Sequence, residues 1–441
     1  MTNTNEPVDG DIEFSVALDR RVAQAKGGSV RYLVAELKAA ARETREAERL
    51  PLNLGLVIDA SGSMSGLKIA TVRHAAAQLV DALAATDRLS IVAFDSSVST
   101  LIDGIRLDKA GRAAAQAMIH QVEAGSMTNL SQGWLTGAES VARVMAHVAH
   151  RRNHVVLFSD GMANQGITDP AELAHHAAQL RDRGLYSSAV GIGDEYQTIQ
   201  LHAIAEHGGG RLHDARSHED ITSVLLGEIG DIKATVADNV VLTVRHPGGY
   251  RFQGLGPYVG RSGNGFTTFP LGALSAGATR TLVARVTCPA AERGSTQPFA
   301  IELSWRDPRS EVVHTRTACV DLLHFDDPRQ VKDQPRDHRL ARTVVTHWHA
   351  DIVLRVTELN RMGDYQEASS YLEQQLHYLR RYCRGLEGTQ HILYEVERLW
   401  RESHRDWGER TRKELYTSSY HASKGTRDYR SRRKLSDSPF M

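Results

Sequence analysis

Between Pro51 and Asp231 the sequence alternates short, continuously apolar runs with longer segments whose apolar residues recur every three or four positions. Continuous apolar runs indicate strands buried on both faces, and the recurring pattern indicates amphipathic helices. Strands that alternate with helices of about 10 to 15 residues predict a mostly parallel, doubly wound α/β sheet. The expected strands are residues 52–59, 88–94, 98–102, 154–158 and 186–192, and the expected helices are residues 67–84, 109–122, 131–148 and 170–183, with two further helical segments after the last strand.

The segments that flank this region carry short strand candidates separated by turns rich in Gly, Pro and Asp, which is the pattern of a β-sandwich. Two strands at residues 13–18 and 31–37, joined by a Lys-Gly-Gly turn, are too short to bury a core alone. We therefore expect them to join the later strands, so that the α/β unit is inserted into a discontinuous β-sandwich; an independent N-terminal hairpin is the alternative. The later strands are expected at residues 240–245, 266–271, 280–287, 299–305 and 312–322.

The C-terminal part of the chain is predicted to be helical. Apolar residues spaced by three and four from Val345 to Leu359 predict one helix, a Met-Gly-Asp turn leads into a second, and a third begins near His391. No repeat of this unit follows, so we expect a small bundle that ends in a mobile tail rich in Ser, Tyr, Lys and Arg. The expected divisions are residues 1–48 for the N-terminal strands, 49–233 for the α/β domain, 234–325 for the β-sandwich, 335–416 for the bundle and 417–441 for the tail.

Oxygen-bearing side chains lie in three loops of the expected α/β unit. Asp59, Ser61 and Ser63 come directly after the first strand, Thr128 precedes a helix, and Asp160 follows the strand at residues 154–158. Open α/β sheets bind ligands outside the carboxyl ends of their strands. Because all five groups are hard oxygen donors without His or Cys, they suit Mg²⁺, or else Mn²⁺ or Ca²⁺, better than zinc or copper.

The order D-x-S-x-S, then Thr in a G-x-x-T-N-L loop, then S-D-G resembles the von Willebrand factor A family and its metal-ion-dependent adhesion site, over about residues 51–230. The resemblance implies that Asp59, Ser61, Ser63 and Thr128 ligate the ion directly or through water, and that Asp160 mostly holds a bound water. It also implies an open sixth position that takes a carboxylate from a partner protein. Met127 stands where relatives often have glycine, and this removes no ligand.

The predicted site suits binding better than catalysis. Two carboxylates leave a divalent ion near neutral, so a Glu or Asp of a partner can complete its coordination at little electrostatic cost. The motif supplies neither a general base nor an activated nucleophile, which predicts a protein that is not an enzyme. The residues expected to touch the partner near the metal are Gly62, Met64, Met127, Asn129 and Gly161.

Two other motifs overlap the first loop. Ser65 to Lys68 matches S-x-x-K but lacks the companion motifs of that class of enzyme. Gly62 to Lys68 resembles a phosphate-binding loop, but only three residues separate its glycines and no Ser or Thr follows the lysine. Neither a serine acyl-enzyme nor a nucleotide site is therefore expected here.

Composition limits the partner and the compartment. Lys plus Arg and Asp plus Glu both number 53, so the zero net charge argues against a general nucleic-acid binder. No apolar run is long enough for a membrane span, the N-terminal residues do not form a signal peptide, and the three cysteines are odd in number. These features predict a cytoplasmic protein.

The sequence leaves the identity of the partner protein open. One alternative is an accessory subunit or substrate adaptor of an AAA-type ATPase complex, as several cytoplasmic relatives of the resembled family are. Another is an adaptor in a Ser/Thr kinase–phosphatase relay, because Ser431, Ser436 and Ser438 lie among basic residues of the tail, where phosphorylation could act as a switch.

Overall fold

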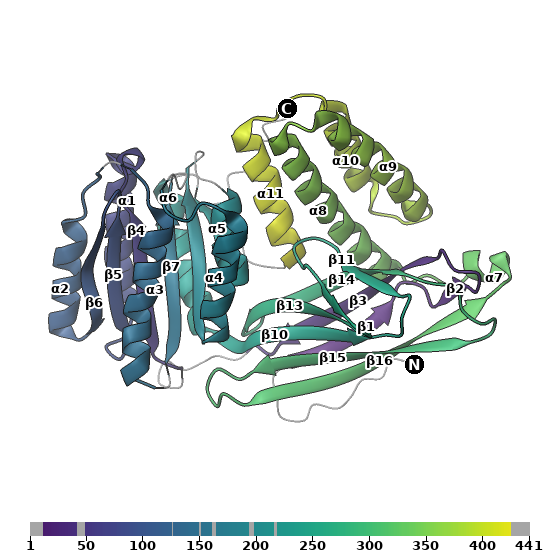
Figure 1. Cartoon of the computed structure of the whole chain (residues 1–441), viewed down its shortest axis with the longest axis horizontal. Helices are drawn as coiled ribbons and strands as arrows, with labels where there is room; N and C mark the ends of the chain where they lie inside the picture. The colour runs from purple at the N-terminus through teal and green to yellow at the C-terminus, as the bar shows by residue number, and fades with distance from the viewer. Residues whose placement is uncertain are drawn as a thin grey trace. The chain divides into compact units, whose positions relative to one another are not determined.

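The computed structural model describes residues 12–41, 49–125, 127–149, 151–160, 165–193, 198–215 and 218–424 (Figure 1). The chain divides into two compact units. One holds the described residues of Thr44–Thr235, and the other combines those of Met1–Glu43 with those of Val236–Arg427. The α/β unit is therefore inserted, in sequence, within the other unit. None of the helices that the structure describes is both long enough and apolar enough to cross a bilayer.

The α/β unit is built on one six-stranded sheet in the order β6-β5-β4-β7-β8-β9, in which only β6 runs antiparallel to its neighbour. Every residue of β4, β7 and β8 is buried, as their apolar sequences predict. The strands are β4 (Leu52–Asp59), β5 (Arg88–Phe94), β6 (Val98–Arg106), β7 (Arg152–Ser159), β8 (Leu185–Ile192) and β9 (Gly209–Ala215).

Helices cover both faces of this sheet (Figure 1). Alternate residues of β4 face opposite sides: Leu56 and Ile58 lie in a core shared with α1, α2 and α6, whereas Val57 lies in a core shared with α3, α4 and α5. The mostly parallel, doubly wound fold predicted from the sequence is confirmed. The helices are α1 (Leu67–Ala82), α2 (Lys109–His120), α3 (Leu130–His147), α4 (Pro170–Asp182), α5 (Thr198–His207) and α6 (His218–Lys233).

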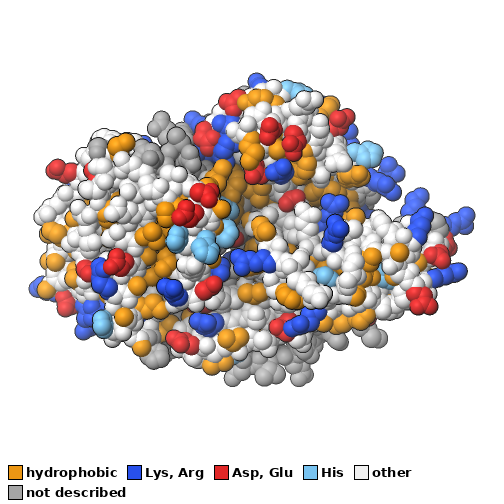
Figure 2. All heavy atoms as spheres, viewed as in Figure 1, with side chains coloured by type: hydrophobic (Ala, Val, Ile, Leu, Met, Phe, Trp, Pro, Cys, Tyr) orange, Lys and Arg blue, Asp and Glu red, His pale blue; other side chains and the backbone are white. Residues whose placement is uncertain are grey.

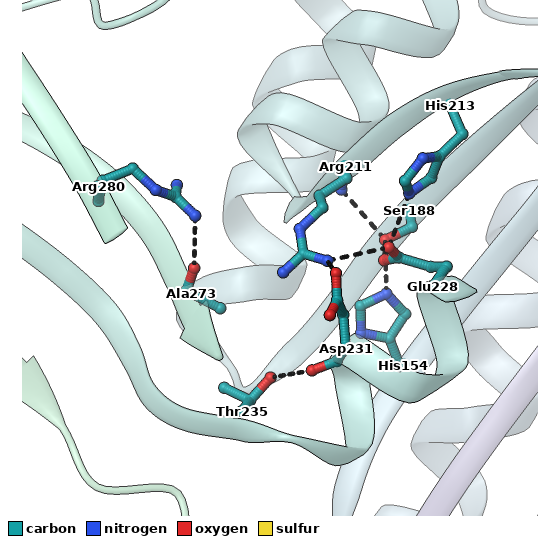
Figure 3. A network of polar contacts seen from close by, with 9 residues as sticks. All are labelled: His154, Ser188, Arg211, His213, Glu228, Asp231, Thr235, Ala273 and Arg280. Atoms are coloured by element: carbon teal, nitrogen blue, oxygen red, sulfur yellow. Dashed lines mark hydrogen bonds and ion pairs between the residues drawn. The ribbon is translucent and has the colours of Figure 1, made fainter. Parts of the chain in front are cut away.

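Strand β9 was not predicted, because its residues are largely polar. His213 and Asp214 are nevertheless buried and Arg211 is partly buried, and Figure 3 shows Arg211 and His213 in a network with α6. Glu228 of α6 accepts hydrogen bonds from Ser188 Oγ of β8 at 2.6 Å and from His213 Nε2 of β9 at 2.7 Å. Arg211 lies 3.4 Å from Glu228 and also pairs with Asp231. These contacts hold α6 against the sheet edge where apolar residues are few.

The β-sandwich consists of a four-stranded sheet, β1-β3-β14-β11, and a six-stranded sheet, β12-β13-β10-β15-β16-β2. Because β3 pairs with both β1 and β14, the N-terminal strands do join the later ones, and the independent hairpin is wrong. The expected Lys-Gly-Gly connection contains an extra strand, β2, that pairs with β16. The strands are β1 (Ile12–Leu18), β2 (Val22–Gln24), β3 (Val30–Ala39), β10 (Thr235–Arg245), β11 (Arg251–Gly254), β12 (Arg261–Gly263), β13 (Phe266–Ser275), β14 (Thr279–Thr287), β15 (Thr296–Arg306) and β16 (Val313–Phe325).

The C-terminal helices pack on the four-stranded sheet through one apolar core that includes Tyr32, Val283 and Trp348. The last helix continues to Lys424 and buries Thr417 and Tyr420, so the expected start of the mobile tail at residue 417 is wrong. Residues 425–441, with the serines of the proposed phosphorylation switch, lie outside the described residues. The helices are α7 (Pro328–Lys332), α8 (His338–Met362), α9 (Tyr365–Cys383), α10 (Gln390–Glu402) and α11 (Gly408–Lys424).

Small residues let α3 lie close to the sheet. A Cβ atom added to Gly133 would fall 2.4 Å from the ring of Phe94, and one on Gly137 would fall 2.3 Å from Val57. We predict that Gly133→Ala lowers the free energy of unfolding by about 1–3 kcal/mol because it overpacks a filled core. Urea denaturation followed by circular dichroism measures this change.

The matched control is Gly230→Ala, in the exposed part of α6, where an added Cβ meets nothing within 4 Å. Replacing a helical glycine by alanine without a clash raises the unfolding free energy by up to about 1 kcal/mol. A change of the same sign in both variants would contradict the close packing of α3.

Burial also predicts a pH dependence for this unit. His154 of β7 is buried, its Nε2 lies 2.9 Å from Ser188 Oγ, and its Nδ1 has no hydrogen-bond partner. Burial lowers the pKa of His154 from 6.5 to about 3. Because the folded-state pKa lies below the unfolded-state value, the neutral ring contributes its full stabilisation to the fold above pH 6.5. This contribution is lost as the pH falls toward 3.

We predict that His154→Gln makes the stability of this unit less dependent on pH between pH 7 and 5. Hydrogen exchange of peptides from β7 and β8, corrected for intrinsic rates, measures the local opening free energy. The control His120→Gln alters an exposed histidine and should retain the wild-type slope. An unchanged slope in His154→Gln would show that the ring is not held neutral.

Candidate metal-ion site at the carboxyl ends of β4 and β7

Asp59 is the last residue of β4, and its side chain is fully buried. One carboxylate oxygen accepts a hydrogen bond from the backbone N–H of Ser61 at 2.9 Å, and the other accepts one from Ser159 Oγ at 2.6 Å. Burial raises the pKa of Asp59, and the negative charge of Asp160 raises it further, although the hydrogen bonds act in the opposite direction. A fixed, buried carboxylate of this kind is stabilised by a nearby cation.

The loop after β4 brings two serine hydroxyls to the same place. Ser61 Oγ and Ser63 Oγ lie 3.1 Å apart, and Ser63 Oγ donates to Asp160 Oδ1 at 2.7 Å. The loop forms a short 3-10 turn at Gly62–Met64, in which Ser63 is exposed while Ser61 is buried. Met64 is 0% exposed and belongs to the core beneath the turn, so the prediction that Met64 touches a partner is wrong.

The segment that carries Thr128 is fixed to the ends of β4 and β5. The N–H of Gly125 donates to the carbonyl of Ala60 at 2.6 Å, and the N–H of Asn129 donates to the carbonyl of Asp95 at 2.9 Å. A Cβ on Gly125 would fall 1.9 Å from a carboxylate oxygen of Asp95, so a side chain here would displace that carboxylate. Thr128 itself is buried in this segment, one residue before the cap of α3.

The remaining predicted contact residues have different roles. Asn129 Oδ1 accepts from the N–H of Gln132 at 3.2 Å and thereby caps α3, which commits its amide to the helix. The side chain of Met127 is 48% exposed beside the loop. Gly161 lies outside the described residues.

Sequence reasoning missed one residue that the structure brings to the site. Lys68, in the first turn of α1, places Nζ 2.5 Å from Asp160 Oδ2. Asp160 is 0% exposed, so both of its oxygens are engaged, one by Ser63 and the other by Lys68. The S-x-x-K pattern contained this lysine, but its ion pair with a residue 92 positions away has no local sequence signal.

The arrangement of oxygens fits a hard divalent cation. An octahedral ion with ligands at 2.0–2.1 Å needs neighbouring oxygens about 3 Å apart. Ser61 Oγ and Ser63 Oγ, at 3.1 Å, are close to that spacing, and Asp160 Oδ1 lies next to this pair, 2.7 Å from Ser63 Oγ. Among the described residues no group of three or more His, Cys, Asp or Glu side chains offers a competing metal site.

Comparison with known proteins places the α/β unit in a family. Residues 53–225 match the model of the von Willebrand factor type A domain. The uncharacterized protein sll0103 of Synechocystis is 34% identical over 176 residues, which are 40% of each chain. The inter-alpha-trypsin inhibitor heavy chain H3 of Rattus norvegicus is 30% identical over 177 residues. That match covers 39% of this chain and 20% of the heavy chain, so the likeness to both relatives is confined to one part of each.

A solved structure resembles the chain over nearly its whole length. The von Willebrand factor type A protein from Catenulispora acidiphila superposes with a TM-score of 0.70, covering 93% of this chain and 96% of that one at 16% identity. At this identity the likeness shows a shared fold. Proteins of the matched family are typically protein-interaction modules with a metal-ion-dependent adhesion site. Residues 53–225 of this chain are a von Willebrand factor type A domain.

Proposed function

We propose that this protein captures a partner protein through a divalent cation, Mg²⁺ by preference, with Mn²⁺ or Ca²⁺ as alternatives. Asp59, Ser61, Ser63 and Thr128 would hold the ion directly or through water, and Asp160 would hold a bound water. When bound, the ion supplies a positive charge whose open position a Glu or Asp carboxylate of the partner completes. The observation that carries the proposal is that Ser63 Oγ lies within hydrogen-bond distance of both Ser61 Oγ and Asp160 Oδ1 at the carboxyl ends of β4 and β7.

The chemistry of the three loops favours binding over catalysis. Their hydroxyls and carboxylates are hydrogen-bonded to one another, and Asp160 is paired with Lys68, so the set does not take the form of a nucleophile activated by an adjacent base. Hard oxygen donors suit Mg²⁺, which dehydrates reluctantly and therefore selects a well-placed carboxylate.

The rim of the site supports a protein as the partner. Ser63 is exposed, and large apolar side chains lie in solvent at Met127, beside Thr128, and at Leu67, the first residue of α1, with 48% and 63% exposure. Protein interfaces combine polar groups with apolar side chains, among which methionine is enriched, so exposed apolar residues near the proposed ligands favour a protein partner. Acidic and basic side chains are interspersed over the face seen in Figure 2, which does not favour a nucleic-acid partner. We propose Gly62, Met127 and Gly161 as residues that contact the partner protein.

We predict that Ser63→Ala weakens Mn²⁺ or Mg²⁺ binding to the whole chain by at least about tenfold, because it removes a ligand oxygen. Isothermal titration calorimetry measures the dissociation constant. Ser65→Ala is the matched control, because this serine lies in the same exposed loop but is not a proposed ligand. Its hydroxyl donates to the carbonyl of Gly62. Equal metal affinity in the two variants would contradict the assigned ligand set.

Capture of the partner tests the second half of the proposal. The chain is immobilised and exposed to native lysate with Mg²⁺, with EDTA, and as the Asp59→Ala/Ser61→Ala double variant, and retained proteins are identified by mass spectrometry. We expect a partner that is lost in both the EDTA and the variant samples and retained by Ser65→Ala. An AAA-type ATPase or a kinase or phosphatase among such partners would assign the pathway. A partner that survives both treatments would contradict metal-bridged capture.

A further inference from the structure

We propose that Lys68 makes the metal site selective for a bound carboxylate: by neutralising Asp160 it weakens cation binding and leaves the bound cation with a net positive charge. This inference rests on the proposed function and assigns a role to a lysine that is not a ligand. It concerns the affinity of the site for the metal ion relative to its affinity for the acidic residue of the partner.

The ion pair is part of the site's interior. Lys68 Nζ lies 2.5 Å from Asp160 Oδ2, and the two side chains are 30% and 0% exposed. The side chain of Lys68 passes over the end of β8, where its Cε lies 3.8 Å from the position that a Cβ would occupy on Gly193. That separation is an ordinary van der Waals distance, so the side chain of Lys68 lies beside the end of β8.

The position of Lys68 in its own helix does not account for the pairing. Lys68 is the second residue of α1, and a positive charge at a helix N-terminus is unfavourable because it meets the positive end of the helix dipole. The ion pair with Asp160 offsets this cost, because a buried carboxylate without a partner destabilises the fold. Lys68 therefore acts as a built-in cation beside the place where the metal ion would bind.

The charges of the site show the consequence. Asp59 and Asp160 together would cancel the two positive charges of the metal and leave no net attraction for a third carboxylate. With Lys68 added, the same set carries a net charge of one positive. At separations of a few ångströms in a partly buried site, one unit charge alters a binding constant by about tenfold or more. The lysine should thus oppose the cation and attract an anion.

The test compares Lys68→Met, Lys68→Arg and wild type in the full-length chain. Mn²⁺ affinity is measured by calorimetry, and acetate binding to the Mn²⁺-loaded protein is measured by water-proton relaxation. Lys109→Met is the matched control, because Lys109 is an exposed lysine in the first turn of α2. We expect Lys68→Met to bind Mn²⁺ about tenfold more tightly and acetate about tenfold more weakly. Lys68→Arg and Lys109→Met should stay near wild type.

Opposite shifts for the cation and the anion are the signature, because a general loss of structure would weaken both. The unfolding temperature of metal-free Lys68→Met should fall below that of Lys109→Met, since Asp160 is then buried without its counter-charge. If wild type binds Mn²⁺ and Lys68→Met matches Lys109→Met for both ligands, only this inference is overturned. If wild type binds no Mn²⁺, the proposed function is overturned together with it.

Discussion

The α/β unit must compensate the negative charges of two carboxylates that are buried at the carboxyl ends of β4 and β7, and the structure of the site depends on this compensation. Both strands are buried along their whole length, so the sheet can place polar chemistry only where these strands end. Asp59 and Asp160 lie at those ends with no exposed surface. Their negative charges require compensation, which serine hydroxyls, the backbone N–H of Ser61 and Lys68 supply. In the proposed function a divalent cation adds to this compensation.

The strands and helices that build the site could be predicted because their sequences are locally consistent. β4 and β5 begin and end at the predicted residues, since continuous apolar runs stop at Asp59 and at Phe94. Insertion of the α/β unit followed from the shortness of the first two predicted strands, which need the later strands to bury a core. Ser61, Ser63 and Asp160 were found from their spacing, and the structure brings their oxygens together. That these residues bind a metal ion stays a proposal.

The features that could not be predicted depend on contacts between distant residues. β9 is buried by hydrogen bonds and ion pairs with α6, and hydrophobicity gives no signal for such a strand. Met64 was expected at the surface because it follows the motif, yet the 3-10 turn directs it into the core. Lys68 belongs to two motifs that do not predict a metal site, and the fold brings it to Asp160. The extension of α11 past Thr417 likewise depends on packing within the C-terminal helices.

The most direct measurement is anomalous X-ray diffraction from crystals of the full-length protein grown with Mn²⁺. We predict one strong anomalous peak at the ends of β4 and β7, within about 2.2 Å of oxygens of Asp59, Ser61, Ser63 and Thr128 or of waters that these residues and Asp160 hold. The site should leave one coordination position to solvent or to a carboxylate from another molecule. A peak that lies elsewhere, or the lack of any peak at these loops in Mn²⁺, would contradict the account.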